Sequence, residues 1–277
     1  MNIKSLVTTS VIAMAAASAA QAADVIIPRE TAPAVIAAPS FSWTGFYVGG
    51  QVGNFSSKVE ITEPSRNKLN KDLTPKPSGF MGGIYVGSNV DLGNGLILGV
   101  ETDAVWADRE ETKERFTNVL EEDDVGVFRD ELTELRASAA TGKAIADIKA
   151  GDKRTDSSTL KEKWSGATRV RIGFAVADRI MPYVAGGVAY AQMQGTYTIK
   201  ATEATGNAEI ATAKFFDATK TFVGYTIGGG VDFAMTDNVL LRAEYRYSDY
   251  GKKQFDRDTD EFSYKTNDFR VGVAYKF

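Results

Sequence analysis

The chain of 277 residues contains no cysteine and no histidine. The first absence excludes disulfides and thiolate chemistry, and the second removes the commonest general base and the commonest metal ligand. Because most catalytic arrangements depend on these residues, we expect a protein that is not an enzyme and has neither a cofactor nor a metal site. A formal net charge of -4 is also unlike the basic footprint of a nucleic-acid-binding protein.

Long apolar runs are missing after the N-terminus, since no later segment offers the roughly 18 consecutive apolar residues of a transmembrane helix. A chain of this kind enters a membrane only as strands. Residues 1–4 are short and positively charged, residues 5–19 are apolar and rich in alanine, and residues 20–22 fit a small-x-small cleavage site. Residues 1–22 are therefore expected to form a signal peptide, the alternative being an uncleaved anchor.

Proline is scarce, but Pro28, Pro33 and Pro39 lie close together in a segment otherwise rich in alanine and valine. Such a composition favours an extended linker over a packed element, and residues 23–40 are expected to form a periplasmic tail. From Phe41 onward the pattern changes to alternating apolar and polar residues, the period of a β-strand with one apolar face.

Eight stretches with this period follow one another to the C-terminus. They are residues 43–55, 80–92, 96–106, 164–176, 181–195, 221–234, 239–250 and 266–277. Their connections alternate in length, because residues 93–95, 177–180 and 235–238 are tight turns while the other four linkers are long and charged. Outer-membrane barrels have short turns at the periplasmic end and longer loops at the extracellular end. Residues 41–277 are therefore expected to form an all-β, eight-stranded antiparallel transmembrane barrel with four extracellular loops, the longest at residues 107–163.

Charged residues on the predicted strands fall on one face. Turning Arg242 and Arg246 toward lipid would cost about 2 to 4 kcal/mol each near the midplane, so the charged face belongs inside. The same reasoning assigns ten residues to the lumen: Glu101, Asp103, Arg169, Arg171, Asp232, Arg242, Glu244, Arg246, Asp268 and Arg270. Since an eight-stranded barrel is only wide enough for its own side chains, we expect an ion-pair network that fills the interior. The alternative is a charged pore constriction.

Aromatic residues gather near the ends of the predicted strands, as in the interfacial girdles of membrane barrels. Trp43, Phe233, Tyr275 and Phe277 are expected at the periplasmic rim, and Phe55, Trp106, Trp164, Tyr247 and Tyr250 at the outer rim. The alternating last strand ends on Phe277, which resembles the signal that the barrel-assembly machinery reads. That machinery and outer-membrane lipid are therefore expected partners.

The second loop contains apolar residues at helical spacing. Val125, Phe128, Leu132, Leu135 and Ala139 recur every three or four positions, and Gly142 suits a helix end. We expect a helix between residues 121 and 142, either folded over the barrel mouth or another loop, or binding a partner through its apolar stripe.

The remaining loops, residues 56–79, 198–220 and 251–265, are polar and show no catalytic arrangement. The acidic runs at residues 110–111 and 121–124 lack the glycine turn and ligand spacing of a calcium loop, which favours solvated charges.

Several segments carry a resemblance to a known family. They are residues 41–50 (FSWTGFYVGG), 182–190 (PYVAGGVAY), 228–232 (GGGVD), 236–238 (TDN) and 242–247 (RAEYRY). Together they resemble the small outer-membrane and hemin-binding proteins of intracellular alpha-proteobacteria, over the strands and the signal peptide but not over the second loop. The resemblance implies an abundant surface-exposed barrel of a Gram-negative outer membrane that is an immunogen, and, in one branch, a receptor for hemin.

Without histidine, hemin iron would take tyrosine, methionine or lysine as an axial ligand, or none, with the propionates held by basic residues. The candidates near the outer rim are Tyr197, Tyr247, Tyr250, Tyr264, Lys252, Lys253 and Lys265.

Three functions are therefore open. The first is a surface barrel that binds hemin through its extracellular loops, together with a host-surface component. The others are a structural, envelope-stabilising or adhesive barrel, and a small porin.

Overall fold

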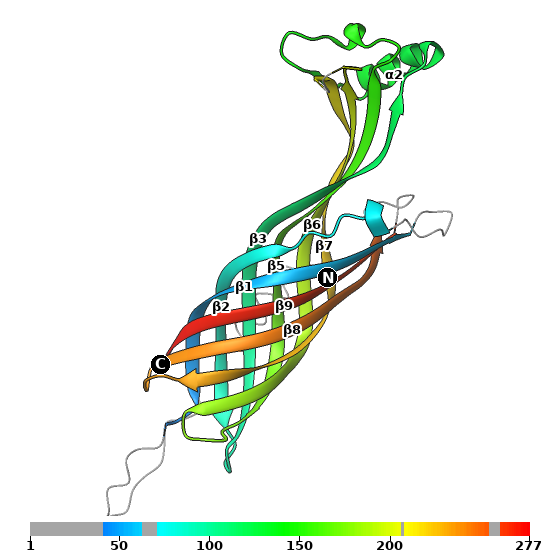
Figure 1. The fold of residues 1–277 in the computed structure, drawn as a ribbon. Helices are drawn as coiled ribbons and strands as arrows, with labels where there is room; N and C mark the ends of the chain where they lie inside the picture. Colours follow the sequence, from blue (N-terminus) through cyan, green and yellow to red (C-terminus); the bar gives the residue numbers. More distant parts are fainter. Residues whose placement is uncertain (1–40, 63–70, 206–207, 255–260) are drawn as a thin grey trace, which may run out of the picture.

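The computed structural model describes residues 41–62, 71–205, 208–254 and 261–277; the expected signal peptide and periplasmic tail lie outside these residues. Eight long antiparallel strands form one closed ring in the order β1-β2-β3-β5-β6-β7-β8-β9, and β9 pairs with β1 to complete it (Figure 1). Their bounds are β1 Gly45–Thr62, β2 Gly79–Asp91, β3 Leu96–Val119, β5 Lys153–Phe174, β6 Ile180–Thr202, β7 Glu209–Ala234, β8 Val239–Gln254 and β9 Glu261–Lys276. The predicted eight-stranded antiparallel barrel is confirmed.

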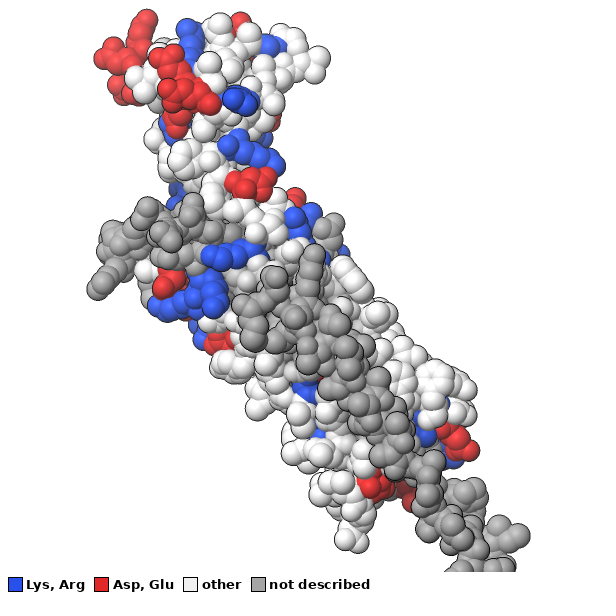
Figure 2. Space-filling view, turned by 180° about the vertical axis from the view of Figure 1, so that it is seen from behind, with Lys and Arg blue, Asp and Glu red and all other residues white. Residues whose placement is uncertain are grey.

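The alternating sequence gives the barrel two unlike faces. Apolar side chains such as Val52, Ile172 and Val271 are exposed on the outer wall, while the residues between them point inward. Figure 2 shows the wall of the barrel nearly free of charged side chains, which gather instead at its two ends and beyond its mouth. β6, whose two faces look alike in sequence, turns Ala185, Ala189 and other small residues inward. Among the described residues, no helix is long and apolar enough to cross a membrane.

The three short connections are tight turns, as predicted. They join β2 to β3, β5 to β6 and β7 to β8, each with four or five residues between the strands. In the first, Gly93, Asn94 and Gly95 all have positive φ angles, a conformation that glycine and asparagine adopt at little cost.

Four strands continue far beyond the barrel, which corrects the predicted loop boundaries. β3 runs to Val119 and β5 starts at Lys153, so both arms of the expected loop at 107–163 are strand. β6 and β7 likewise occupy most of the expected loop at 198–220. Together, residues 109–119, 153–162, 193–202 and 209–220 form what we call the outer sheet, the narrow stalk above the barrel in Figure 1. The apolar-polar alternation in the sequence does not reveal this sheet, because one of its faces meets water and the other carries a mixture of polar and aromatic side chains.

The two other predicted loops are also shorter than expected. β1 extends to Thr62, followed by the short 3-10 helix η2 (Lys71–Leu73). β8 extends to Gln254 and β9 begins at Glu261, so strand pairing occupies both ends of the expected loop at 251–265.

Residues 120–152 form a cap on the outer sheet, built from α2 (Glu122–Glu134), β4 (Ser138–Ala139) and the 3-10 helix η3 (Ile145–Asp147). The predicted helix is present but ends at Glu134, and Ala139 pairs with β7 instead of continuing the helix. Its apolar stripe is buried, since Phe128 and Leu132 pack with Ile199, Ile210 and other residues of the outer sheet. The apolar stripe of α2 therefore packs against the outer sheet and is not available to a partner. The helix covers the sheet and not the barrel mouth.

Candidate functional site

The ten charged residues assigned to the lumen all lie in the barrel interior. Each is at most 7% exposed, and five arginines meet five carboxylates: Arg169, Arg171, Arg242, Arg246 and Arg270 with Glu101, Asp103, Asp232, Glu244 and Asp268. A buried charge is tolerated only when it is paired and hydrogen-bonded, and equal numbers of the two signs satisfy that condition.

The pairs connect into one network that crosses the lumen. Glu101 accepts hydrogen bonds from Arg169 (2.6 Å) and Arg171 (3.2 Å) and also pairs with Arg242. Arg169 reaches on to Glu244 at 2.9 Å. Arg246 then joins Glu244 to Asp103, and Arg270 joins Asp103 to Asp268 at 2.7 Å. Each arginine is shared between two carboxylates, so the network holds its members in place from several strands at once.

Aromatic side chains fill the space around this network. The guanidinium of Arg171 lies 3.8 Å from the ring centre of Tyr183, and that of Arg242 lies 4.4 Å from the ring centre of Tyr85. The phenol of Tyr47 donates to Glu101 at 2.8 Å. Charged and aromatic side chains therefore lie together in the interior at this level.

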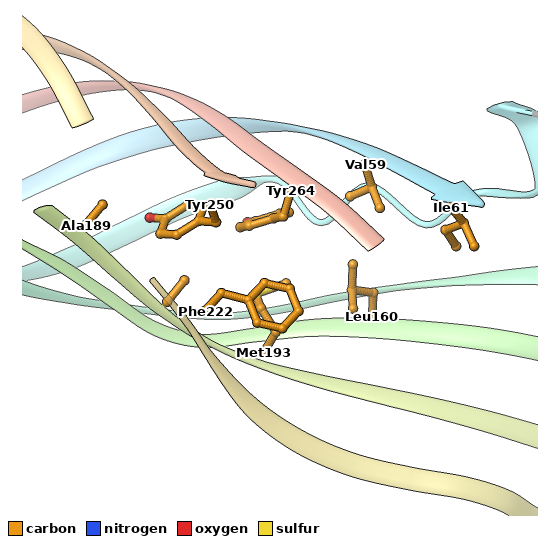
Figure 3. Close-up of a cluster of buried hydrophobic side chains, with 9 residues drawn as sticks. Val59, Ile61, Leu160, Ala189, Met193, Phe222, Tyr250 and Tyr264 are labelled. Atoms are coloured by element: carbon orange, nitrogen blue, oxygen red, sulfur yellow. The ribbon is translucent and has the colours of Figure 1, made fainter. Parts of the chain in front are cut away.

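Two apolar clusters lie on either side of the charged network. The cluster toward the mouth joins Val59, Ile61, Leu160, Ala189, Ala191, Met193, Phe222, Tyr250 and Tyr264 (Figure 3). The cluster at the opposite end includes Trp43, Ile97, Met181 and Leu240. A smaller cluster joins Phe55, Met81 and Val105. Apolar and charged side chains therefore occupy the described lumen at several levels.

These clusters correct three of the predicted girdle residues. Trp43, Phe55 and Tyr250 are 1–3% exposed and point into the barrel, whereas Trp106 is 54% exposed on the outer wall as expected. An aromatic residue near a strand end suits either face, and only strand phase decides between them.

The seven candidate hemin residues do not form one site. Tyr250 and Tyr264 stack inside the barrel with ring centres 5.4 Å apart. Tyr247 lies on the outer wall against Tyr225, and Lys265 pairs with Asp249 on the same side. Lys252 pairs with Glu261 and Lys253 is exposed near the end of β8, while Tyr197 lies higher, on the outer sheet.

A pocket of about 520 Å³ lies on one face of the outer sheet, between the barrel mouth and the cap. We call it the aromatic pocket. Its lining comprises Ile61, Pro75, Arg115, Phe116, Glu131, Arg154, Asp156, Ser158, Thr159, Leu160, Gly195, Thr196, Tyr197, Ile199, Phe215, Phe216 and Phe262. Leu160 and Ile61 belong also to the apolar cluster that closes the barrel, so that cluster forms part of the floor of the pocket.

Arg154 ties the cap to the wall of the pocket. It donates to Glu131 of α2 at 2.7 Å and to Asp156 of its own strand at 2.8 Å, and these two carboxylates hold its pKa above the ordinary value. Its guanidinium also lies 5.1 Å from the ring centre of Phe128 and 5.9 Å from that of Phe116. These contacts link α2 of the cap to β5, which forms part of the wall of the pocket.

Tyr197 lies in the middle of the pocket wall. Its phenol donates to Asp156 at 2.9 Å, its ring meets that of Phe215 edge to face at 6.0 Å, and the guanidinium of Arg115 lies 5.6 Å from its centre. Burial and the neighbouring Asp156 carboxylate raise the pKa of Tyr197 to about 12, so the phenol keeps its proton at neutral pH.

Sequence reasoning identified Tyr197 but missed the rest of the pocket. Arg115, Arg154 and Phe215 fall within predicted loops, whereas the structure has them on strands β3, β5 and β7 of one sheet. The signal that was available is the run of β-favouring residues at 196–199 (TYTI), since threonine, tyrosine and isoleucine favour strands.

A closed antiparallel barrel with an apolar outer wall, tight turns at one end and long extensions at the other is the architecture of outer-membrane β-barrel proteins. The Porin subfamily matches residues 80–273, more than half of the chain. The chain belongs to this family.

Curated relatives agree with that assignment. The chain is 29% identical over 282 residues to a 31 kDa outer-membrane immunogenic protein of Brucella melitensis biotype 1, covering 99% of this chain and 100% of that protein. A 25 kDa outer-membrane immunogenic protein of the same organism is 27% identical and covers 100% of this chain and 99% of its own length. A 22 kDa outer membrane protein of Rhizobium leguminosarum bv. viciae is 28% identical over 86% of this chain and 80% of that protein.

These findings confirm the expected alpha-proteobacterial outer-membrane barrel family, and the protein is located in the cell outer membrane. The relatives are named as outer-membrane proteins and immunogens and not as enzymes.

Proposed function

We propose that this protein is a non-enzymatic surface receptor that binds hemin in the aromatic pocket, with the barrel serving as its membrane anchor. The observation that supports the proposal is the pocket itself, whose volume of about 520 Å³ falls within the range of small-molecule sites. It lies outside the barrel wall that faces lipid, on the extension that leads away from the membrane (Figure 1).

The lining suits a flat amphipathic ligand. Phe116, Tyr197 and Phe215 offer ring surfaces against which a large aromatic system stacks. Arg115 supplies a cation at the same wall, where it would meet a propionate of hemin. Tyr247 and Lys265 at the rim do not line this pocket, which is why we place the ligand on the outer sheet.

The filled lumen argues against the porin alternative. A channel would have to pass two apolar clusters and the network around Glu101 and Arg169, in which every charge is paired. An eight-stranded barrel is just wide enough for its own side chains. Refolded protein in planar bilayers is therefore expected to give no uniform conductance steps. Stable single-channel steps would support the porin alternative instead.

An adhesive role toward a host-surface component remains compatible with the extended outer sheet, and recognition of Phe277 by the barrel-assembly machinery is part of the same proposal. Both concern partners other than the ligand of the pocket.

A hemin titration tests the proposal. Refolded protein in detergent should shift the Soret band of hemin in a saturable manner, with one site per chain. Changing Phe215 and Phe216 together to alanine removes two rings, each contributing about 0.5 to 1.5 kcal/mol, so affinity should fall roughly tenfold. The matched control changes Tyr247 and Lys265 to alanine at the rim and should leave affinity unchanged.

Two outcomes of this titration would contradict different parts of the proposal. Linear uptake without saturation, as into a detergent micelle, would refute hemin binding. Saturable binding that is lost in the rim variant and kept in the pocket variant would move the site to the barrel mouth and refute the assignment to the pocket.

A further inference from the structure

We infer that the aromatic pocket recognises the flat ring system and acidic edge of its ligand and not a metal ion at its centre, so that metal-free porphyrins belong to its ligand class alongside hemin. This inference rests on the proposed function and names its ligand class. It follows from the donors that the pocket holds and from how each is already engaged.

Apart from Tyr197, the described lining of the pocket has no side chain of the kinds that usually bind heme iron. Proteins ligate heme through histidine, cysteine, methionine or tyrosine, and this chain has neither of the first two. Of the methionines that the structure describes, Met81, Met181 and Met193 are buried in the barrel interior, and Met235 lies in the turn before β8. Among the described residues that line the pocket there is also no lysine.

Tyr197 is the one tyrosine of the described lining, and its oxygen is committed to the sheet. The phenol donates to Asp156, whose side chain is buried, so binding iron would require Tyr197 to lose both its proton and this hydrogen bond. A tyrosinate at that position would also lie beside the Asp156 carboxylate, and two negative charges at this distance repel each other. The geometry therefore presents the ring of Tyr197 to the pocket and keeps its oxygen occupied.

The two carboxylates of the lining are engaged as well. Arg154 forms paired hydrogen bonds with both oxygens of Glu131, at 2.7 Å and 3.2 Å, and with both oxygens of Asp156, at 2.8 Å and 3.2 Å. A metal ion that took either carboxylate would have to break a two-pronged charge-assisted contact. Oxygen ligation thus competes with the contacts that hold the cap in place.

The lining instead offers ring faces and guanidinium groups. The edge-to-face pair of Tyr197 and Phe215, the ring of Phe116 and the guanidinium of Arg115 lie around one cavity. Stacking on these groups depends on the area and polarity of a planar π system, and an arginine reads a carboxylate at its edge. Neither interaction requires the central metal.

The experiment compares hemin with protoporphyrin IX, which has the same ring and carboxylates and no iron. Hemin binding is followed by its Soret band, and protoporphyrin binding by the porphyrin's own fluorescence. Wild-type protein should bind the two with dissociation constants within about threefold of each other. Tyr197→Phe removes the oxygen and keeps the ring, so it should leave both constants within about threefold and leave the spectrum of bound hemin unchanged. The double change of Phe215 and Phe216 to alanine should weaken both ligands equally, by roughly tenfold.

Hemin bound more than about tenfold tighter than protoporphyrin IX would overturn the inference, since that difference would have to come from the iron. So would a ferric-tyrosinate absorption band that disappears in Tyr197→Phe. Hemin binding without protoporphyrin binding would overturn this inference and leave the proposed function standing. Protoporphyrin binding without hemin binding would refute both, because the pocket would then distinguish the two ligands by the iron. Saturable binding of neither ligand refutes both.

Discussion

Replacing Glu101 with glutamine tests whether the ion network holds the barrel together. Glu101 is fully buried and accepts hydrogen bonds from Arg169 at 2.6 Å, from Arg171 at 3.2 Å and from Tyr47 at 2.8 Å, while also pairing with Arg242. The amide has the same shape as the carboxylate, so it leaves no cavity. It removes one negative charge and turns one acceptor into a donor that faces arginine N–H groups.

The expected cost follows from the burial of these arginines. With Glu101 neutral, five arginines meet four carboxylates, and one positive charge of the interior is left uncompensated. Removing one partner of a buried pair costs about 3 to 5 kcal/mol because the remaining charge stays out of water. The remaining network absorbs part of this cost, because Arg169 keeps Glu244 and Arg171 keeps Asp232. We therefore expect a loss of about 3 kcal/mol in the free energy of unfolding.

The assay is urea unfolding of the protein refolded in lipid vesicles, followed by tryptophan fluorescence and by the shift in gel mobility between unboiled and boiled samples. The matched control is Glu60→Gln, which breaks the 3.4 Å pair with Lys58 above the barrel wall. An exposed pair of this kind contributes about 0 to 1 kcal/mol. A Glu101→Gln variant as stable as this control would refute the claim that paired charges hold the interior.

Three further predictions concern the strands and the cap. Gly187→Ala places a Cβ against the carbonyl of Thr168 and 2.7 Å from the Cα of Arg169, so refolding yield should drop sharply, whereas Gly186→Ala meets nothing closer than 3.6 Å and should refold normally; equal yields would contradict the close packing. Arg154→Ala removes the ion pair with Glu131. The free energy of local opening of α2, measured by amide hydrogen exchange, should fall by about 1 to 3 kcal/mol, while the barrel strands keep their protection. Unchanged exchange in α2 would show that the cap is held by its apolar core alone. The pKa of Tyr197 is raised to about 12, so the folded protein keeps the phenol proton at a pH where the unfolded chain loses it. The contribution of Tyr197 to the free energy of unfolding should therefore be constant below about pH 10 and fall between about pH 10 and 12. Tyr197→Phe should remove that part of the decline in alkaline unfolding curves.

The barrel itself was within reach of sequence reasoning, because a lipid-facing wall imposes a strict rule on every second residue. Arg242 and Glu244 alternate with Leu241 and Ala243, and the cost of a charge in lipid assigns each set to one face. The tight turns were recognisable for a similar reason, since residues 93–95 carry the glycine and asparagine that a positive φ requires. The buried end of the helical stripe at Phe128 and Leu132 was also visible in its spacing.

The outer sheet and its pocket escaped the same reasoning because no lipid faces them. Outside the bilayer, strands such as residues 109–119 carry charged side chains with little penalty, and the alternation that marks a strand disappears. Whether an aromatic residue faced in or out was equally open, as the interior positions of Trp43 and Tyr250 show.

By itself, the sequence determined that the chain crosses the membrane as eight strands, that its charges point inward and that histidine and cysteine chemistry are excluded, since each of these depends on residue type and local period. Only the tertiary structure decided that Arg115, Arg154, Tyr197 and Phe215 share one cavity. They belong to four strands far apart in the chain, and they meet because β3, β5, β6 and β7 stay hydrogen-bonded beyond the barrel. Such a site depends on the register between strands, which no single stretch of sequence encodes.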